Sequence, residues 1–480
     1  MKGTVVSKKE IRVYGQYFTP IEIFKTYILP EIKDKLYNYL WVDLFAGEGN
    51  LILPILDEIP SENKIDFFRD HIYLFDIHPE MVERAVQNAI KYGIPEKLAR
   101  EKIKVRDTIA NYPEFILQEK FPVYHITNPP YLYLGNISKN KNLDKYLKYF
   151  EGENEGYQDL YQLALINDLR HNIPKMIYII PSNFLFGSSV SNKIRKDFLS
   201  FYNITKAIIF EKKIFKHTGT HTVICFFERK DTKRDETQKF KALKLNSTEK
   251  SRIYILKPKY HYRAGTEFKD FCSIMKVKNP IKVKFYLFLE DIKKNIGNCE
   301  IKVLDVNEYT PKGYRVKNFK VNNSFCTKIK NNILFIRTLD TGTKKGKAGL
   351  YVIKEIFGVD GLLVSKAPYR THPIQLFLYP TLSYQDQIFL KDYFNLILDY
   401  FRKLTDSEFM TTYKYSQSEY TRKYLGLTQV KDLIATFPIL ELTEESKKEL
   451  KTLVYSGNAE EVINFLYNLN KRGRYYGIKE

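Results

Sequence analysis

The sequence predicts an α/β fold with a doubly wound, mostly parallel sheet in the N-terminal half of the chain. Two observations indicate this fold. Short β-branched and aromatic runs alternate with helix-like segments over residues 1–230, and acidic residues stand at the ends of the first three runs. A third observation, the charged and polar residues at 228–238, predicts where this half ends. Beyond it, the sequence predicts a second domain of the α+β class.

Seven apolar runs are predicted to be strands, because each is rich in β-branched or aromatic residues and is bounded by polar or turn residues. Amphipathic segments such as Pro79–Tyr92 and Leu160–Asn172 are expected to form connecting helices. No helical segment separates the last two runs, so we expect an antiparallel pair at one edge. In chain order, the runs are Trp41–Phe45, Ile72–Phe75, Ile103–Val105, Val123–Ile126, Met176–Ile180, Ala207–Phe210 and Val223–Phe227.

The chain of 480 residues is long enough for two or three domains. Residues 239–380 contain short β-like pieces separated by lysine, asparagine and glycine, whereas the tail from about Tyr384 returns to helical spacing. We therefore expect one domain over residues 1–235 and a second over residues 236–480, with a helical C-terminal part.

The positive charge is concentrated in the second half of the chain. Residues 1–230 hold 32 Lys and Arg against 28 Asp and Glu, residues 231–480 hold 45 against 28, and the net charge is +21. Double-stranded DNA is a natural partner, because neutralised phosphates release counterions. Lysines that only aid solubility are the alternative. Candidate DNA contacts, for which solvated loops are the alternative, are Lys257, Lys259, Arg263, Lys344 and Lys345.

Other features exclude several classes of protein. No run of about 18 uncharged apolar residues occurs, so no membrane span is expected, and the basic N-terminus lacks the apolar core of a secretory signal. His217 and His221 are four residues apart without a third ligand, so no metal is expected. The cysteines form no CxxC pair, and we expect all of them to be reduced thiols in a cytosolic protein. They are Cys225, Cys272, Cys299 and Cys326.

The first predicted strand runs into a glycine-containing turn. Gly47 and Gly49 would let the backbone approach a ligand, and Asp43 stands at the strand end, where an open α/β sheet binds ligands. Asp76 ends the second strand and could hold a ribose, and Asp107 follows the third and could accept a hydrogen bond from an adenine amine. A third, phosphate-binding glycine is missing, which fits S-adenosylmethionine. For each acid judged singly, a helix cap or turn is the alternative.

Upstream, residues 15–20 read Gly-Gln-Tyr-Phe-Thr-Pro. Thr19 is expected to cap a helix whose first residue is Pro20, and Glu22 would complete a capping box. The same turn could also cover the methionine end of the cofactor.

The most specific motif, Asn128-Pro129-Pro130-Tyr131, follows the fourth strand. The lone pair of an adenine N6 is delocalised into the ring, so two acceptors aimed at its protons would make the nitrogen more nucleophilic. The Asn128 side-chain oxygen and the Pro129 carbonyl can be these acceptors, and two prolines keep the loop rigid. Tyr131 offers a face on which a base can stack. The sulfonium of S-adenosylmethionine is already activated, so this chemistry requires no metal.

An adenine inside duplex DNA cannot reach such a loop, so the base must be rotated out at a cost of about a few kcal/mol. A second aromatic ring is expected on its other face. Phe215 is the candidate, and an ordinary core phenylalanine is the alternative.

The order of these motifs over about residues 12–230 resembles the gamma group of DNA amino-methyltransferases of restriction–modification systems. Residues 156–161 (GYQDLY), 180–185 (IPSNFL) and 191–199 (SNKIRKDFL) are similar to further segments of this group. The resemblance implies a Rossmann-like S-adenosylmethionine-dependent methyltransferase domain with a mostly parallel seven-stranded sheet, followed by an α+β target-recognition domain.

The resemblance also implies roles for individual residues. One departure is Glu48, where the group often has a small or polar residue. Cofactor contacts are expected from Tyr17, Thr19, Pro20, Asp43, Phe45, Gly47, Gly49, Asp76, Ile77, Asp107 and Thr108. Catalysis and base stacking are expected from Asn128, Pro129, Pro130, Tyr131 and Phe215.

We therefore expect a site-specific DNA methyltransferase that methylates N6 of a flipped-out adenine in a short duplex target and leaves S-adenosylhomocysteine as product. The resemblance implies the modification component of a restriction–modification system, in the prokaryotic cytosol at the nucleoid, with a cognate restriction endonuclease encoded separately as a further partner.

Four alternative functions share some of these sequence features. Protein or ribosomal glutamine methyltransferases also use Asn-Pro-Pro-Tyr, but they lack the Thr-Pro element and the long basic C-terminal part. A cytosine-N4 enzyme typically has serine at position 128. A bifunctional restriction–modification enzyme would need a nuclease centre, for which the chain offers only the Glu228-x-Lys230 spacing. A non-catalytic DNA-binding subunit would not need an intact Asn-Pro-Pro-Tyr.

Overall fold

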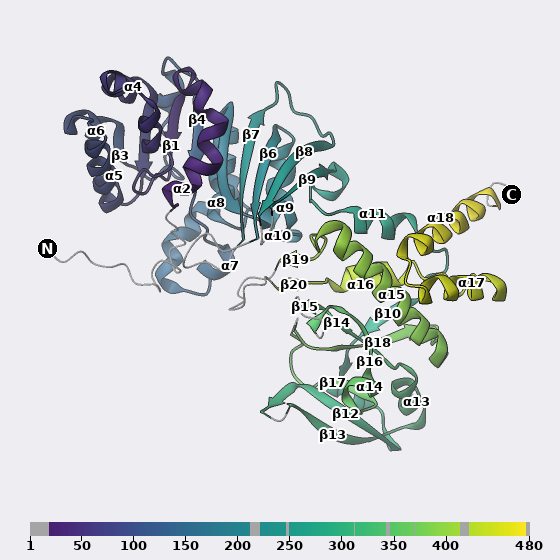
Figure 1. The fold of residues 1–480 in the computed structure, drawn as a ribbon. Helices are drawn as coiled ribbons and strands as arrows, with labels where there is room; N and C mark the ends of the chain where they lie inside the picture. The colour runs from purple at the N-terminus through teal and green to yellow at the C-terminus, as the bar shows by residue number, and fades with distance from the viewer. Residues whose placement is uncertain are drawn as a thin grey trace. The chain divides into compact units, whose positions relative to one another are not determined.

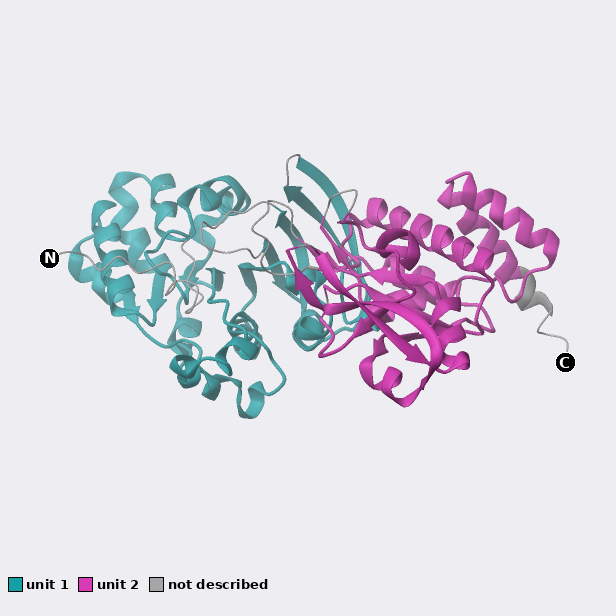
Figure 2. Ribbon diagram, turned by 90° about the horizontal axis from the view of Figure 1, so that it is seen from below, with its two compact units in different colours: residues 1–264 teal, residues 265–480 magenta. Residues whose placement is uncertain are grey.

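The computed structural model describes residues 19–211, 221–245, 249–311, 313–341, 346–369, 371–412 and 422–476. The chain divides into two compact units, residues 1–264 and residues 265–480 (Figure 2). Four predicted site residues lie outside the described residues: Tyr17, Phe215, Lys344 and Lys345. No helix in the described ranges is long and apolar enough to cross a membrane.

Unit 1 is built on a sheet that has nine strands among the described residues, in the order β3-β2-β1-β4-β5-β7-β6-β8-β9 (Figure 1). The first five strands in this order, β3, β2, β1, β4 and β5, run parallel to one another. Strand β7 lies between β5 and β6 and is antiparallel to both. The predicted α/β class and the antiparallel pairing of the last two runs are therefore confirmed, but this pair lies inside the sheet and not at its edge. The strands are β1 Leu40–Asp43, β2 Ile72–Asp76, β3 Ile103–Val105, β4 Val123–Thr127, β5 Lys175–Pro181, β6 Tyr202–Phe210, β7 Thr222–Arg229, β8 Gln238–Leu245 and β9 Glu249–Leu256.

All seven predicted runs belong to strands of this sheet, but the predicted boundary at residue 235 and the predicted sheet size of seven strands are wrong, because β8 and β9 extend the sheet. Strand β8 pairs with β6 in parallel and with β9 in antiparallel orientation. Phe240 and Tyr254 stack on each other and are buried in the same core as β5 and β7. The charged run at 228–238 is therefore a connection within unit 1. Lys257, Lys259 and Arg263 also belong to unit 1 rather than to the second domain.

Successive side chains of a strand point to opposite faces of the sheet. Both faces of this sheet carry apolar side chains, and helices cover both. Leu40 and Val42 enter the core beneath α8, α9 and α10, whereas Trp41 enters the core beneath α4, α5 and α6. The helices of unit 1 are α2 Ile21–Ile23, α3 Leu29–Ile32, α4 Lys64–His71, α5 Pro79–Lys91, α6 Glu96–Lys102, α7 Leu134–Ile137, α8 Leu160–Arg170, α9 Asn183–Phe186 and α10 Ser189–Leu199. Because β1 to β4 are parallel, their carboxyl ends meet at one edge, where Asp43, Asp76 and Thr127 stand.

Unit 2 has the predicted α+β composition, and its largest core combines residues of five helices, α11 and α15 to α18, with strand residues. Within its described residues, the sheets have the orders β10-β18-β14-β16, β11-β17-β12-β13 and β15-β20-β19. The strands are β10 Lys282–Phe285, β11 Leu287–Phe288, β12 Ile296–Thr310, β13 Gly313–Val321, β14 Leu334–Arg337, β15 Leu339–Asp340, β16 Gly349–Val352, β17 Gly361–Val364, β18 Ile374–Tyr379, β19 Thr411–Thr412 and β20 Lys423–Tyr424. The helices are α11 Glu267–Ile274, α12 Leu289–Lys294, α13 Asn323–Asn331, α14 Ile353–Phe357, α15 Tyr384–Thr405, α16 Leu427–Ile434, α17 Glu444–Tyr455 and α18 Ala459–Tyr476.

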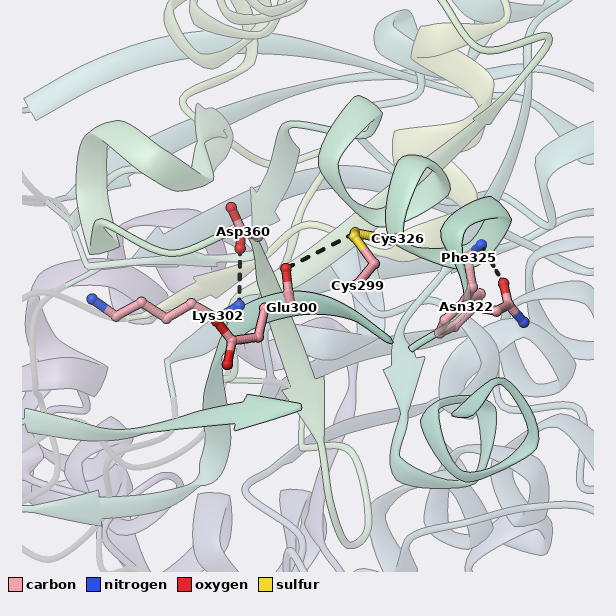
Figure 3. Close-up of a disulfide and its surroundings, with 7 residues drawn as sticks. All are labelled: Cys299, Glu300, Lys302, Asn322, Phe325, Cys326 and Asp360. Carbon is pink, nitrogen blue, oxygen red and sulfur yellow. Dashed lines mark hydrogen bonds between the residues drawn. A yellow bond between two sulfur atoms is a disulfide. The ribbon is translucent and has the colours of Figure 1, made fainter. Parts of the chain in front are cut away.

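A disulfide joins Cys299 of β12 to Cys326 of α13 (Figure 3). The prediction of four reduced thiols is therefore wrong for this pair. The hairpin of β12 and β13 reverses the chain, which brings two cysteines 27 residues apart to a Cα–Cα distance of 6.1 Å. The side chain of Asn322 caps α13 by accepting from the Phe325 amide at 2.8 Å. Cys225 and Cys272 are free and buried.

Candidate active site

A cavity at the carboxyl ends of β1, β2 and β4 brings together most of the predicted site residues. Its lining includes Thr19, Asp43, Phe45, Gly47, Asp76, Ile77, Asp107 and Thr108 of the predicted cofactor set, and Asn128 and Pro130 of the predicted catalytic set. Four other described residues of these two predicted sets do not line it: Pro20, Gly49, Pro129 and Tyr131. Sequence reasoning missed the remaining lining residues, which are Ala46, Glu48, Asn50, Leu51, His78, Met81, Ile109, Tyr146, Tyr149 and Leu160.

Asp43 ends β1 with a side chain that is only 1% exposed. Its Oδ1 atom accepts from the Thr127 hydroxyl at 2.6 Å and from the Phe45 amide at 2.9 Å. Burial raises the pKa of Asp43 to about 6, because loss of water disfavours the charged form, and the hydrogen bonds lower it only in part. This carboxylate therefore links the end of β1 to the end of β4.

The glycine turn after β1 uses conformations that L side chains rarely adopt. The φ angles of Gly47 and Gly49 are 53° and 84°. A Cβ at Gly49 would lie 2.6 Å from a methyl of Leu53, so this glycine serves close packing. The carboxylate of Glu48 forms an ion pair with Arg84 at 2.9 Å. Glu48, where this chain departs from the gamma-group pattern, is thus compatible with an ordinary turn.

Asp76 connects the second strand to the glycine turn. Its Oδ2 atom accepts from the Gly47 amide at 2.8 Å, and its Oδ1 atom accepts from the His78 amide at 2.9 Å, just before α5 begins. Desolvation raises the pKa of Asp76, although these backbone hydrogen bonds oppose the shift. Asp76 is therefore a turn residue, as the alternative expected, and it also lines the cavity.

Asp107 is paired with a residue that sequence reasoning missed. Its Oδ2 atom accepts from the Tyr149 hydroxyl at 2.5 Å, and its Oδ1 atom accepts from the Ala110 amide at 3.2 Å. Tyr149 and Tyr146 come from the 3-10 segment Lys141–Phe150 and line the cavity. The available signal was the amphipathic spacing of this segment, but nothing in the spacing alone connects it to the third strand.

Thr19 does not cap a helix, so that prediction is wrong. The helix begins at Ile21, Pro20 is its N-cap, and no side-chain cap bond forms. The Thr19 hydroxyl instead accepts from Asn128 Nδ2 at 3.0 Å, and the Thr19 carbonyl accepts from Asn50 Nδ2 at 3.1 Å. The upstream turn is thereby attached to the loop after β4.

The side-chain amide of Asn128, in the loop after β4, forms a hydrogen bond at each of its two ends. Its Nδ2 atom donates to Thr19, and its Oδ1 atom accepts from the Tyr131 hydroxyl at 2.5 Å. The Ile179 carbonyl is a second acceptor for this hydroxyl at 2.8 Å, although a tyrosine has one proton to donate. Tyr131 is 6% exposed, forms a T-shaped ring contact with Tyr161 and does not line the cavity.

The predicted DNA contacts differ in exposure. Lys259 is exposed at the 3-10 turn Pro258–Tyr260, and Lys257 is half-buried. Arg263 is half-buried, its Nε donates to the Phe186 carbonyl at 2.8 Å, and desolvation lowers its pKa to about 10. These contacts tie Arg263 to the protein and do not favour a phosphate contact.

The Glu228-x-Lys230 spacing serves structural contacts. Glu228 forms an ion pair with Lys175 at 2.9 Å, and Lys230 is 8% exposed and donates to the carbonyls of Leu199 and Arg234. Within the described ranges, no group of three or more His, Cys, Asp or Glu is arranged to hold a metal ion.

The family model described as N-6 DNA Methylase matches residues 5–306. This range is more than half of the chain and contains every residue of the cavity. The chain belongs to the N-6 DNA methylase family. The match covers unit 1 from residue 5 onward and ends within β12 of unit 2. No curated protein matches the chain.

Among the solved structures that the chain matches are restriction–modification proteins. A type I methyltransferase subunit from Streptococcus thermophilus is 17% identical, with 48% of each chain covered and a TM-score of 0.34. The type I EcoKI M protein has the same identity and coverage, with a TM-score of 0.33. The type ISP enzyme LlaBIII bound to DNA is 12% identical over 91% of this chain and 39% of that one, with a TM-score of 0.43. The chain thus spans about half or less of the length of these proteins.

Proposed function

We propose that this member of the N-6 DNA methylase family is a site-specific DNA methyltransferase that transfers a methyl group from S-adenosylmethionine to N6 of an adenine. One observation carries the proposal: a single cavity is lined both by the acids of β1, β2 and the β3 end and by Asn128 and Pro130 of the loop after β4. A methyl donor held at the strand ends would therefore meet a base held at that loop.

The chemistry of the cavity fits this cofactor. Four carboxylates line it, from Asp43, Glu48, Asp76 and Asp107, and none of its described lining residues is a lysine or arginine. Such a lining would repel phosphate groups and suits a ligand that carries a positive charge and no phosphate. Asp76 would hold the ribose hydroxyls, and Asp107 with Tyr149 would hold the adenine end. When bound, the cofactor supplies an activated methyl group.

Asn128 is the proposed catalytic residue. Its Oδ1 atom would accept one proton of the adenine amine and the Pro129 carbonyl the other, which increases the electron density on the nitrogen. The bond from Thr19 holds the amide so that Nδ2 points away from the amine and Oδ1 remains the acceptor. The Tyr131 hydroxyl can turn to the Ile179 carbonyl when the amine takes its place at Oδ1.

The substrate would be duplex DNA with the target base rotated out. Phe45, Tyr146 and Tyr149 line the cavity with aromatic rings, and Phe215 remains a proposed stacking partner outside the described residues. The excess of basic residues beyond residue 230 supports a polyanionic partner. We further propose that the protein modifies DNA for a restriction–modification system in the prokaryotic cytosol, with a separately encoded endonuclease.

The substitution Asn128→Ala tests this function. Removal of a preorganised hydrogen-bond partner of the reacting group is expected to reduce methyl transfer by at least roughly 100-fold. The measurement is incorporation of labelled methyl groups into DNA from S-adenosylmethionine, and affinity for S-adenosylhomocysteine should stay close to that of the wild type. The matched control is Asn142→Ala, which removes an exposed asparagine.

Nucleoside analysis of the methylated DNA distinguishes the alternatives. The proposal requires N6-methyladenine as the product. N4-methylcytosine would identify the cytosine enzyme, and methyl groups found only on protein would identify a glutamine methyltransferase. Undiminished methyl transfer by the Asn128→Ala variant would exclude the proposed chemistry.

A further inference from the structure

Four polar side chains meet inside unit 1, and the mechanism proposed above does not use them. His125 of β4, Asp168 of α8 and Tyr178 of β5 are 0% exposed, and Tyr112 is 8% exposed. Buried polar groups destabilise a protein unless they are hydrogen-bonded. Packing alone would have been served by an apolar residue at position 125, since the neighbouring strand residues are buried and mostly apolar.

Asp168 accepts hydrogen bonds from all three of the other side chains. Its Oδ2 atom lies 2.5 Å from His125 Nδ1 and 2.6 Å from the Tyr178 hydroxyl, and its Oδ1 atom lies 3.0 Å from the Tyr112 hydroxyl. Desolvation, reinforced by Asp168, raises the pKa of both tyrosines well above the ordinary value, so both remain protonated donors.

The second ring nitrogen of His125 determines which tautomer is present. Its Nε2 atom lies 3.2 Å from the backbone nitrogen of Leu44, and an amide N–H can only donate. Nε2 must therefore be unprotonated, and the ring proton resides on Nδ1, where it is donated to Asp168. The carboxylate of Asp168 thus fixes His125 as an acceptor for the Leu44 amide.

The Leu44 amide needs such an acceptor because β1 ends one residue earlier. The pairing of β1 with β2 ends at Asp43, and its pairing with β4 ends at Val42, so neither neighbouring strand supplies an acceptor for Leu44. The Leu44 carbonyl accepts from the Thr108 hydroxyl at 2.8 Å. Both polar groups of this residue are therefore held by side chains at the point where the chain leaves the sheet.

We propose that His125 is a positioning residue for the cofactor. By holding the Leu44 amide, it fixes the direction of Asp43 and Phe45, the two cavity-lining residues on either side of Leu44. Asp168 acts through His125 by setting its tautomer. This inference rests on the proposed function, because it assumes that the cavity binds S-adenosylmethionine and its product.

Two substitutions separate the two hydrogen bonds of His125. In His125→Asn, the side-chain amide can still donate to Asp168 but is too short to accept from Leu44. In His125→Gln, the side chain is long enough to place an acceptor near the Leu44 amide. The probe is S-adenosylhomocysteine, titrated calorimetrically into the full chain. We expect roughly five- to tenfold weaker binding by the Asn variant and binding within about twofold of wild type by the Gln variant.

Tyr178→Phe is the matched control, because it removes another donor to Asp168 and leaves the bond from Leu44 to His125 intact. It should lower the melting temperature without changing affinity for S-adenosylhomocysteine. A purely structural cluster would instead make affinity follow stability in all three variants, and that result would overturn the proposal. Equal binding by wild type and the Asn variant would also overturn it.

The failure of this inference is distinguishable from failure of the proposed function. Absence of any binding by the wild-type chain would overturn both, whereas unchanged affinity in the Asn variant overturns only the role of His125. If the His125→Asn variant fails to fold, a crystal structure of the wild-type chain with S-adenosylhomocysteine tests the proposal instead. Contact of Asp43 or Phe45 with the ligand would support the proposal, and a ligand that touches neither would overturn it.

Discussion

At the scale of the residue, Asp43 lines the candidate cavity and also lowers the stability of the fold when it ionises. Its side chain is buried, and desolvation raises its pKa to about 6, compared with about 3.8 for an exposed aspartate. Between these two values, the unfolded chain has released the proton while the folded chain retains it. Folding is therefore weakened as the pH rises through this window, by roughly 3 kcal/mol at neutral pH.

The substitution Asp43→Asn should remove this pH dependence. An asparagine keeps the acceptor for the Phe45 amide and the Thr127 hydroxyl but never ionises. Relative to wild type, we expect the variant to gain stability at pH 7.5 and little at pH 4.5, as measured by denaturant unfolding. Affinity for S-adenosylhomocysteine should fall at pH 7.5. An equal stability difference at both pH values would show that Asp43 does not titrate in this window.

Residues with a strand-end position could be predicted from the sequence, whereas residues that reach the cavity from elsewhere could not. Asp43, Asp76 and Asp107 were identified because the carboxyl ends of parallel strands meet at one edge. Tyr149 and His125 were missed because their roles depend on partners 42 and 81 residues away in the chain. No periodicity within one segment specifies such a partner.

At the scale of the element, β8 and β9 show why a charged linker is a weak sign of a domain boundary. The segment at 228–238 has the composition of a linker, yet the chain beyond it returns to the sheet beside β6. The strand pattern at the start of β8 is clear in hindsight, since the buried Phe240 and Ala242 alternate with the exposed Lys239 and Lys241. Local composition gives no information about which edge of a sheet a strand will join.

Truncation tests this boundary. A fragment that ends at residue 235 lacks β8 and β9, so the edge of β6 and part of the core that contains Tyr254 and Leu256 would be exposed to water. We expect that fragment to aggregate, and a fragment that ends at residue 264 to be monomeric and to unfold cooperatively. Size-exclusion chromatography and circular dichroism measure both properties. Equal stability of the two fragments would contradict the assignment of β8 and β9 to unit 1.

At the scale of the whole molecule, the two units have separate cores and separate sources of stabilisation. The candidate cofactor cavity lies entirely in unit 1, and the disulfide lies entirely in unit 2. Binding of S-adenosylhomocysteine at 100 times its dissociation constant would stabilise its unit by about 2.7 kcal/mol. A disulfide that closes a loop between cysteines 27 residues apart contributes about 3–4 kcal/mol in the chain-entropy model.

We therefore expect calorimetry of the full chain to resolve two unfolding transitions that respond to different additions. S-adenosylhomocysteine should raise the temperature of one transition, and a reducing agent should lower the temperature of the other, because each acts on a different core. The variant Cys326→Ser is the matched control. Its unit 2 transition should already lie at the lower temperature and should not respond to the reducing agent, since Cys225 and Cys272 are free thiols. A single transition shifted by both additions would mean that the two cores unfold as one cooperative block.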